Sequence, residues 1–215
     1  MTAWGAAVAH VGGDEDVARE AWRELEARYG ERHRHYHDLA HATAVARDGA
    51  RLAAEAGLGP DECAAVALAA WAHDVVYDAV PGEDERASAA WLCHWLTRAG
   101  AGAHHVERAE ALVLATAAHE APEDDEAATA LLDADLAILG ATPAVYAGYA
   151  TAVRREYAKY DDPAWAAGRA AVLANLLARP VLYRSETARA RWETAARRNL
   201  AAELTRWREH AGDHR

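Results

Sequence analysis

Residues 64–78 read AAVALAAWAHDVVYD, and this stretch decides the fold class. Its first half carries small or apolar side chains on nearly every face, which is typical of a helix buried among other helices. In the rest of the chain alanine and leucine dominate, β-branched clusters are scarce, and apolar residues recur at every third or fourth position. We therefore expect an all-α protein with the helix that carries this stretch near its centre.

Helix-capping and helix-breaking residues divide the chain into nine predicted helices. Gly30, Gly57 and Gly140 are typical of helix ends, Pro143 suits a first turn, and Ser185 is a typical N-cap. The predicted helices cover residues 14–29, 37–56, 61–78, 83–99, 103–119, 125–139, 143–157, 162–178 and 185–209. Because no repeat of about 20 to 50 residues and no flexible linker separates them, we predict one compact domain over 1–215, a bundle of eight to nine helices.

Composition limits the classes of partner. Of the 215 residues 52% are hydrophobic and 27% charged, and 34 acidic against 23 basic residues give a net charge of -11. Polymeric nucleic acid is therefore not an expected partner. No apolar run reaches the roughly 18 residues of a membrane span, and residues 3–13, AWGAAVAHVGG, lack the basic start of a secretory signal. We expect a cytoplasmic protein without membrane contact, in which Cys63 and Cys93 are reduced thiols that pack in the fold.

Histidine is the most informative residue type, with 12 in the chain. His33, His35, His37 and His41 fall within nine positions. His37 and His41 are spaced i, i+4, so on a helix both imidazoles leave the same face and could meet at one site. The alternative is an exposed polar face.

Acidic side chains interrupt two apolar segments. Asp74 follows His73 at the end of the predicted central helix, where a buried charge is costly unless it is paired. A divalent cation would satisfy both side chains, and a hydrogen-bonded structural pair is the alternative. Asp133 and Asp135 lie among the core residues of the 125–139 helix, about 200° apart around its axis. Only one of those two carboxylates is therefore expected to face a given site.

The order of these residues resembles the H…HD…D signature of the HD-domain superfamily of metal-dependent phosphohydrolases. Seven strings carry the resemblance over roughly residues 30 to 200. They are RHRHYHDLAHA (32–42), WAHDVVYD (71–78), DERASA (84–89), TAAH (116–119), DADLAILG (133–140), VRREY (153–157) and ARRNL (196–200). The resemblance implies a single HD-type helical domain.

It also implies a set of metal ligands. His41 matches the first histidine of the signature, His73 and Asp74 match the HD pair, and Asp135 matches the last aspartate. Asp135 is preferred to Asp133 because the second aspartate of the DAD string is the one that aligns in related HD enzymes. The implied cofactor is one divalent ion per chain, with Mn, Co, Ni, Zn, Fe and Mg all open. Asp74 would also orient or deprotonate a water bound to that ion.

Further roles follow from the same resemblance. His37 corresponds to a leaving-group acid, although the next residue is an aspartate where the related phosphodiesterases usually have asparagine, so support of the ligands is its alternative role. Glu85 is a candidate base, with an ordinary helix N-terminal carboxylate as the alternative. His119, Arg34 and Arg154 are candidate contacts to a substrate phosphate. The alternative for His119 is a ligand of a second metal, and the alternative for the two arginines is a surface ion pair.

The implied activity is hydrolysis of a phosphate ester or anhydride in a small phosphorylated substrate, with a nucleotide as the expected class. A non-catalytic HD module that binds a metal or a nucleotide for regulation is the first alternative, and a di-iron HD oxygenase is the second. The helix-bundle surface could support a homodimer, but the sequence contains no heptad seam to define one.

Overall fold

The computed structural model describes residues 2–80 and 82–212, except for the side chains of 210–212. Helices make up 73% of the structure and no strand occurs among the described residues, which confirms the all-α class. The number of helices is slightly above the predicted eight to nine. Residue contacts divide the chain into two compact units, Met1–Asp135 (unit 1) and Leu136–Arg215 (unit 2). The single domain over 1–215 stays a prediction.

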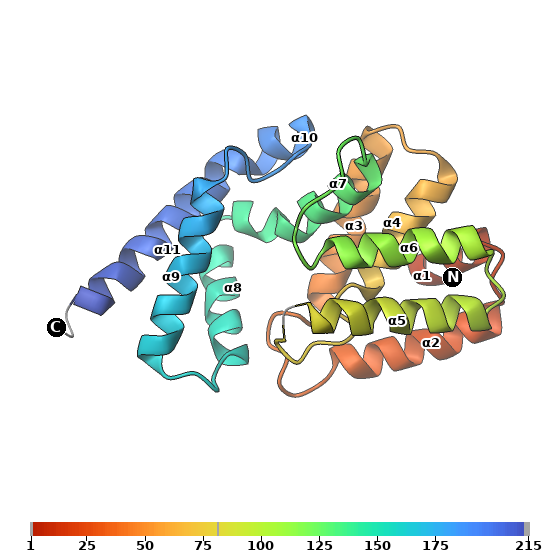
Figure 1. The fold of residues 1–215 in the computed structure, drawn as a ribbon, viewed down its shortest axis with the longest axis horizontal. Coiled ribbons are helices and arrows are strands. Elements are labelled where there is room, and N and C mark those ends of the chain that lie inside the picture. Colours follow the sequence, from red (N-terminus) through yellow and green to blue (C-terminus); the bar gives the residue numbers. More distant parts are fainter. Residues whose placement is uncertain (1, 81, 213–215) are drawn as a thin grey trace. The chain divides into compact units, whose positions relative to one another are not determined.

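Unit 1 is built from seven α-helices (Figure 1). They are α1 (Ala3–His10), α2 (Glu15–Tyr29), α3 (Leu39–Glu55), α4 (Pro60–Ala72), α5 (Glu83–Arg98), α6 (Ala103–Ala115) and α7 (Glu126–Asp135). Helix α4 packs against α1, α3, α5, α6 and α7, and eight of its thirteen residues are buried. Its alanines let these helices approach closely, and the predicted central position is confirmed.

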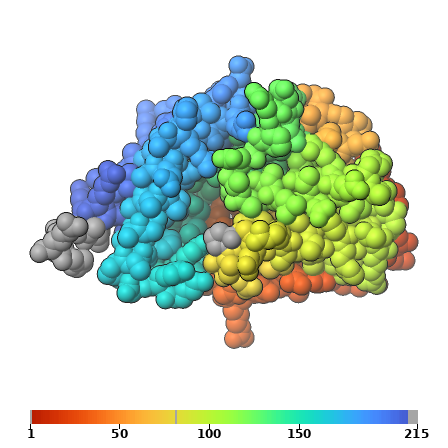
Figure 2. All heavy atoms as spheres, viewed as in Figure 1, coloured from red at the N-terminus to blue at the C-terminus, as the bar shows by residue number. Residues whose placement is uncertain are grey.

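One face of unit 1 is formed by two helices that lie side by side. Figure 2 shows α5 and α6 covering this face, and the two helices also pack directly against each other. Trp91, Leu92, Trp95 and Leu96 of α5 are buried beneath it, as are Leu112 and Val113 of α6. Charged side chains such as Glu107 stay on the outside, so both helices are amphipathic in the usual sense.

Helix α1 is not predicted by the sequence pattern. It begins after Thr2, whose hydroxyl caps the backbone N–H of Gly5. Trp4 is 1% exposed, and its indole N–H donates to the carbonyl of Ala18 at 3.0 Å. A helix this short is not stable alone, and burial of Trp4 and Val8 supplies the stabilisation.

Unit 2 contains the remaining helical segments. They are the 3₁₀ turn η1 (Leu136–Gly140), α8 (Pro143–Glu156), α9 (Asp162–Ala178), α10 (Glu186–Ala188), the π-helical turn η2 (Arg189–Glu193) and α11 (Thr194–Gly212). Helix α9 packs on α11, where Arg169 and Glu203 form a buried pair at 2.8 Å. The Tyr146 hydroxyl also donates to Glu203, and the Asn199 amide donates to the carbonyls of Leu139 and Ala141.

Among the described residues, no helix by itself has both the length and the hydropathy of a membrane span. One bent pair, Glu126–Gly140 with Pro143–Glu156, reaches the required length and hydropathy only when both helices are taken together.

Candidate metal centre

His41 lies in the first turn of α3. The helix begins at Leu39, so the predicted start at residue 37 is two residues too early, and His37 lies in the bend before it. The Asp38 carboxylate caps α3 by accepting from the backbone N–H groups of Ala40 and His41. This cap explains the start of α3, and it holds the backbone of His41, whose side chain is 3% exposed.

His73 and Asp74 lie just beyond the end of α4. The prediction of a helix through residue 78 is wrong here, because α4 ends at Ala72 and His73 is its C-cap. The backbone of the following loop is held by side chains instead. Arg34 donates to the carbonyls of Asp74 and Val75 at 2.6 and 3.0 Å.

The ring of His73 is also oriented from within the same helix. Its Nδ1 lies 2.9 Å from the carbonyl of Ala70, which can only accept, so Nδ1 carries a proton. In the neutral ring Nε2 therefore keeps its lone pair and is the atom available to a ligand.

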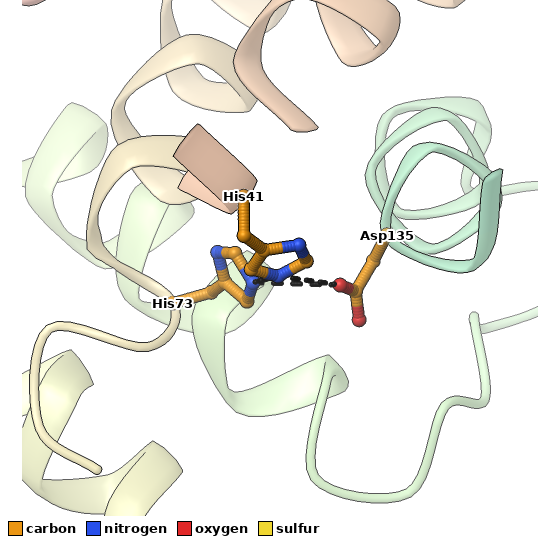
Figure 3. Close-up of side chains that lie close together, drawn as sticks. All are labelled: His41, His73 and Asp135. Atoms are coloured by element: carbon orange, nitrogen blue, oxygen red, sulfur yellow. Dashed lines mark hydrogen bonds and ion pairs between the residues drawn. The ribbon is translucent and has the colours of Figure 1, made fainter. Parts of the chain in front are cut away.

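The side chains of His41 and His73 converge with that of Asp135, the last residue of α7 (Figure 3). His41 Nε2 lies 3.1 Å from His73 Nε2 and 3.2 Å from Asp135 Oδ1. Asp74 Oδ2 lies 3.3 Å from His41 Nε2 and 3.0 Å from His73 Nε2. We call His41, His73, Asp74 and Asp135 the central cluster. It brings together all four residues that the resemblance implies as metal ligands.

Asp135 and not Asp133 contributes the last carboxylate of this cluster. Both residues are in the final turn of α7, and Asp133 is 2% exposed within the core. The predicted continuous helix over 125–139 is interrupted at this point, because α7 changes to the 3₁₀ turn η1 after Asp135.

The charges of the central cluster balance one another. Burial alone lowers the pKa of an imidazole, yet the carboxylates of Asp74 and Asp135 outweigh it and raise the pKa of His41, and that of His73 strongly. Burial alone raises the pKa of a carboxyl group, yet the histidines outweigh it and hold the pKa of Asp74 and Asp135 well below the usual range. The imidazoles and the two largely buried carboxylates thus stabilise each other's charged forms.

The donor set of the cluster fits a divalent transition metal. One ligand atom each from His41, His73 and Asp135 lies within 4.8 Å of the others, and Asp74 Oδ2 contacts both imidazole nitrogens. Neutral imidazole with carboxylate suits Mn, Fe, Co, Ni and Zn better than Mg. A divalent ion would compensate the charge of the two carboxylates while both imidazoles are neutral.

His119 lies beside the cluster. Helix α6 ends at Ala115, so the prediction of a helix through 119 is wrong, and His119 has a left-handed backbone with φ 49° in the turn that follows. Its Nε2 donates to Asp135 Oδ2 at 2.9 Å. The proposed ligand oxygen Oδ1 and the hydrogen-bonded oxygen Oδ2 therefore belong to one carboxylate, which His119 orients. Phosphate contact by His119 stays a prediction.

His37 stays near the cluster although it is outside the helix. Its ring lies 5.5 Å from that of His41 and stacks on Tyr77 with ring centres 4.2 Å apart. The His37 side chain is partly exposed. Its role as an acid toward a leaving group stays a prediction.

Arg34 has structural partners in the structure. Its side chain is 0% exposed, and besides the carbonyls of Asp74 and Val75 it donates to the carbonyl of His37 and to Glu31. These contacts position the loop that carries Asp74. The phosphate contact of Arg34 stays a prediction.

Glu85 and Arg154 have local structural partners. Glu85 Oε2 accepts from the backbone N–H of Gly82 at 2.6 Å, which is the helix N-terminal carboxylate given above as its alternative. Arg154 is in unit 2, where it donates to the carbonyls of Tyr157 and Tyr160 and pairs with Asp162. The catalytic role of Glu85 and the phosphate contact of Arg154 stay predictions.

Several residues that position the cluster are absent from the sequence-based set. Asp84 accepts from the backbone N–H groups of Asp78 and Val80, and the Ser88 hydroxyl pairs with the backbone of Val76. Tyr29 donates to the carbonyl of Trp71 at the end of α4. The DERASA string, residues 84–89, contains both Asp84 and Ser88. The resemblance therefore included these two residues, but it did not assign them a role.

Comparisons with known proteins give no further identification. No family model, curated protein or solved structure matches this chain.

Proposed function

We propose that this chain is a metal-dependent phosphohydrolase that cleaves a phosphate ester or anhydride in a small phosphorylated substrate, with a nucleotide as the expected class. The observation that carries the proposal is the convergence of two imidazoles and two carboxylates from α3, the end of α4 and the end of α7. The same four residues form the H…HD…D pattern in the sequence.

The chain's own residues support distinct tasks in such a site. His41, His73, Asp74 and Asp135 would hold the ion, which when bound supplies Lewis-acid polarisation of a phosphoryl oxygen and of water. His119 orients Asp135, and Arg34 fixes the loop that carries Asp74. His37, partly exposed beside His41, would hold a proton for the leaving oxygen.

The test is release of phosphate from a panel of nucleoside mono-, di- and triphosphates, with each candidate metal added to the metal-free protein. We expect release by the parent and by His94→Ala, a control that removes an exposed histidine outside the cluster. We expect loss of release in Asp74→Asn and Asp135→Asn, which keep side-chain shape but remove a charge. Circular dichroism confirms that each variant is folded.

The outcomes separate the competing functions. Undiminished release in Asp135→Asn contradicts the proposal. Metal binding without hydrolysis of any panel member favours the regulatory module, and two irons per chain with oxygen consumption favour the oxygenase.

A further inference from the structure

A second group of metal-ligating side chains lies at the ends of three helices in unit 1. His10 is the last residue of α1, Asp61 is in the first turn of α4, and His104 and His105 are in the first turn of α6. We call these four residues the surface cluster. Asp61 and His73 are near opposite ends of α4, so a rise of 1.5 Å per residue separates the two clusters by about 18 Å.

The contacts within the surface cluster are close. One ligand atom each from Asp61, His104 and His105 lies within 4.8 Å of the others. His10 Nε2 lies 2.8 Å from Asp61 Oδ1. All three histidines therefore surround one carboxylate.

The backbone holds the three helix ends together. The N–H of Gly102, the residue before α6, donates to the carbonyl of Val11, which directly follows α1. Helix α4 packs against both α1 and α6. The Cα positions of the surface cluster are thus fixed by the fold, while the side chains of Asp61 and His104 are exposed and can rotate.

The chemistry of this set points to a metal ion and not to an ion pair alone. An ion pair uses one histidine and Asp61, and leaves His104 and His105 unexplained. Three imidazoles with one carboxylate suit Zn²⁺, Co²⁺, Ni²⁺ or Cu²⁺. Tetrahedral zinc with bonds of about 2.0 to 2.1 Å places its ligand atoms about 3.3 Å apart, which modest rotations of exposed side chains would reach from the observed separations.

We propose that the surface cluster is a second divalent transition-metal site, with Asp61, His104 and His105 as ligands and His10 as a fourth ligand or as a hydrogen-bond partner of Asp61. An ion bound there would crosslink the ends of α1, α4 and α6. Its role is to stabilise unit 1, and this role is independent of any reaction at the central cluster.

The test is titration of the metal-free, untagged full chain with Zn²⁺ by isothermal calorimetry near pH 8, where an ordinary imidazole is mostly neutral. The central cluster is first disabled with Asp135→Asn. In this background we compare the His104→Ala/His105→Ala variant with the matched control His94→Ala. The same comparison in the parent chain covers the case in which Asp135→Asn does not fold.

We expect one saturable zinc equivalent per chain fewer in His104→Ala/His105→Ala than in the control, in either background. Zinc should also raise the melting temperature of the control more than that of the double variant. His10→Ala should weaken binding by about tenfold to a hundredfold if His10 supports Asp61 from outside the ion. Equal stoichiometry and affinity in the control and the double variant overturn the proposal.

Discussion

Replacing Arg34 with methionine tests how the loop that carries Asp74 is held in place. Methionine keeps much of the apolar volume of the arginine stem but removes every donor. The side chain of Arg34 is 0% exposed, and its guanidinium donates to the carbonyls of His37, Asp74 and Val75 at 2.6 to 3.0 Å. Arg34→Met leaves these carbonyls without that donor.

The expected loss of stability follows from the three carbonyls that lose their donor. A hydrogen bond from a charged donor contributes about 1.5 to 3 kcal/mol, and such contributions do not add fully within one group. Each buried carbonyl left without its donor costs about 1 to 3 kcal/mol. With three such carbonyls and incomplete additivity, we predict that Arg34→Met lowers the free energy of unfolding by about 3 to 5 kcal/mol.

Urea unfolding followed by circular dichroism measures this change. Arg23→Met removes an exposed arginine from α2 and serves as the control, with an expected change within about 0.5 kcal/mol. Arg34→Lys keeps the charge but not the planar fork, so it should recover only part of the loss. If Arg34→Met unfolds within about 1 kcal/mol of the Arg23 control, the reasoning about the loop is refuted.

Three further predictions concern other parts of the fold. Arg169 holds the pKa of Glu203 below its usual value against the opposing effect of burial, so this pair stabilises the protein above the unfolded-state pKa of glutamate and the stabilisation is lost as pH falls through the folded-state pKa. Melting temperatures measured from neutral to acid pH should therefore fall less steeply in Glu203→Gln than in the parent, and parallel curves would count against the pair. Burial and a neighbouring glutamate raise the pKa of the Cys93 thiol to about 11, so only about a thousandth is thiolate near pH 8. Iodoacetamide labelling of Cys93, followed by mass spectrometry, should be far slower than that of free cysteine, and comparable rates would contradict this. A Cβ on Gly140 would lie 2.5 Å from Cβ of Trp192, so Gly140→Ala should lower the free energy of unfolding by about 1 to 3 kcal/mol; a neutral result in urea unfolding would show that Trp192 moves aside readily.

The helical class and the central position of α4 could be predicted from the sequence, because a helix buried on every face has small or apolar residues at nearly every position. The residue at which α4 ends could not be predicted. Residues 73–78 contain no glycine or proline that would mark a helix end, but Arg34, far away in sequence, donates to the carbonyls of Asp74 and Val75. Such a tertiary contact overrides local helix preference and has no short-range signal.

In the candidate site, too, some features could be predicted from the sequence and others depend on the tertiary structure. The resemblance to the H…HD…D signature implied the four residues of the central cluster, and the structure brings them together. The resemblance alone favoured Asp135 over Asp133, whereas the geometry depends on where α7 ends. The position of His119 depends on the left-handed turn after α6, whereas the helical pattern of residues 103–119 predicted a continuous helix there.

The surface cluster was not predicted because its residues lie far apart in the chain. His104 and His105 are adjacent, but only the packing of α1, α4 and α6 brings His10 and Asp61 beside them. Without that packing the two histidines resemble ordinary exposed residues.

Metal content measured by elemental analysis tests the central claim most directly. The measurement uses untagged protein in the His104→Ala/His105→Ala background, with and without Asp74→Ala, after dialysis against trace divalent metals. We predict about one ion of Mn, Fe, Co, Ni or Zn per chain, lost on Asp74→Ala while circular dichroism shows the fold retained. Absence of bound metal, with none acquired on titration, or equal metal content in both proteins would contradict a metal site at His41, His73, Asp74 and Asp135.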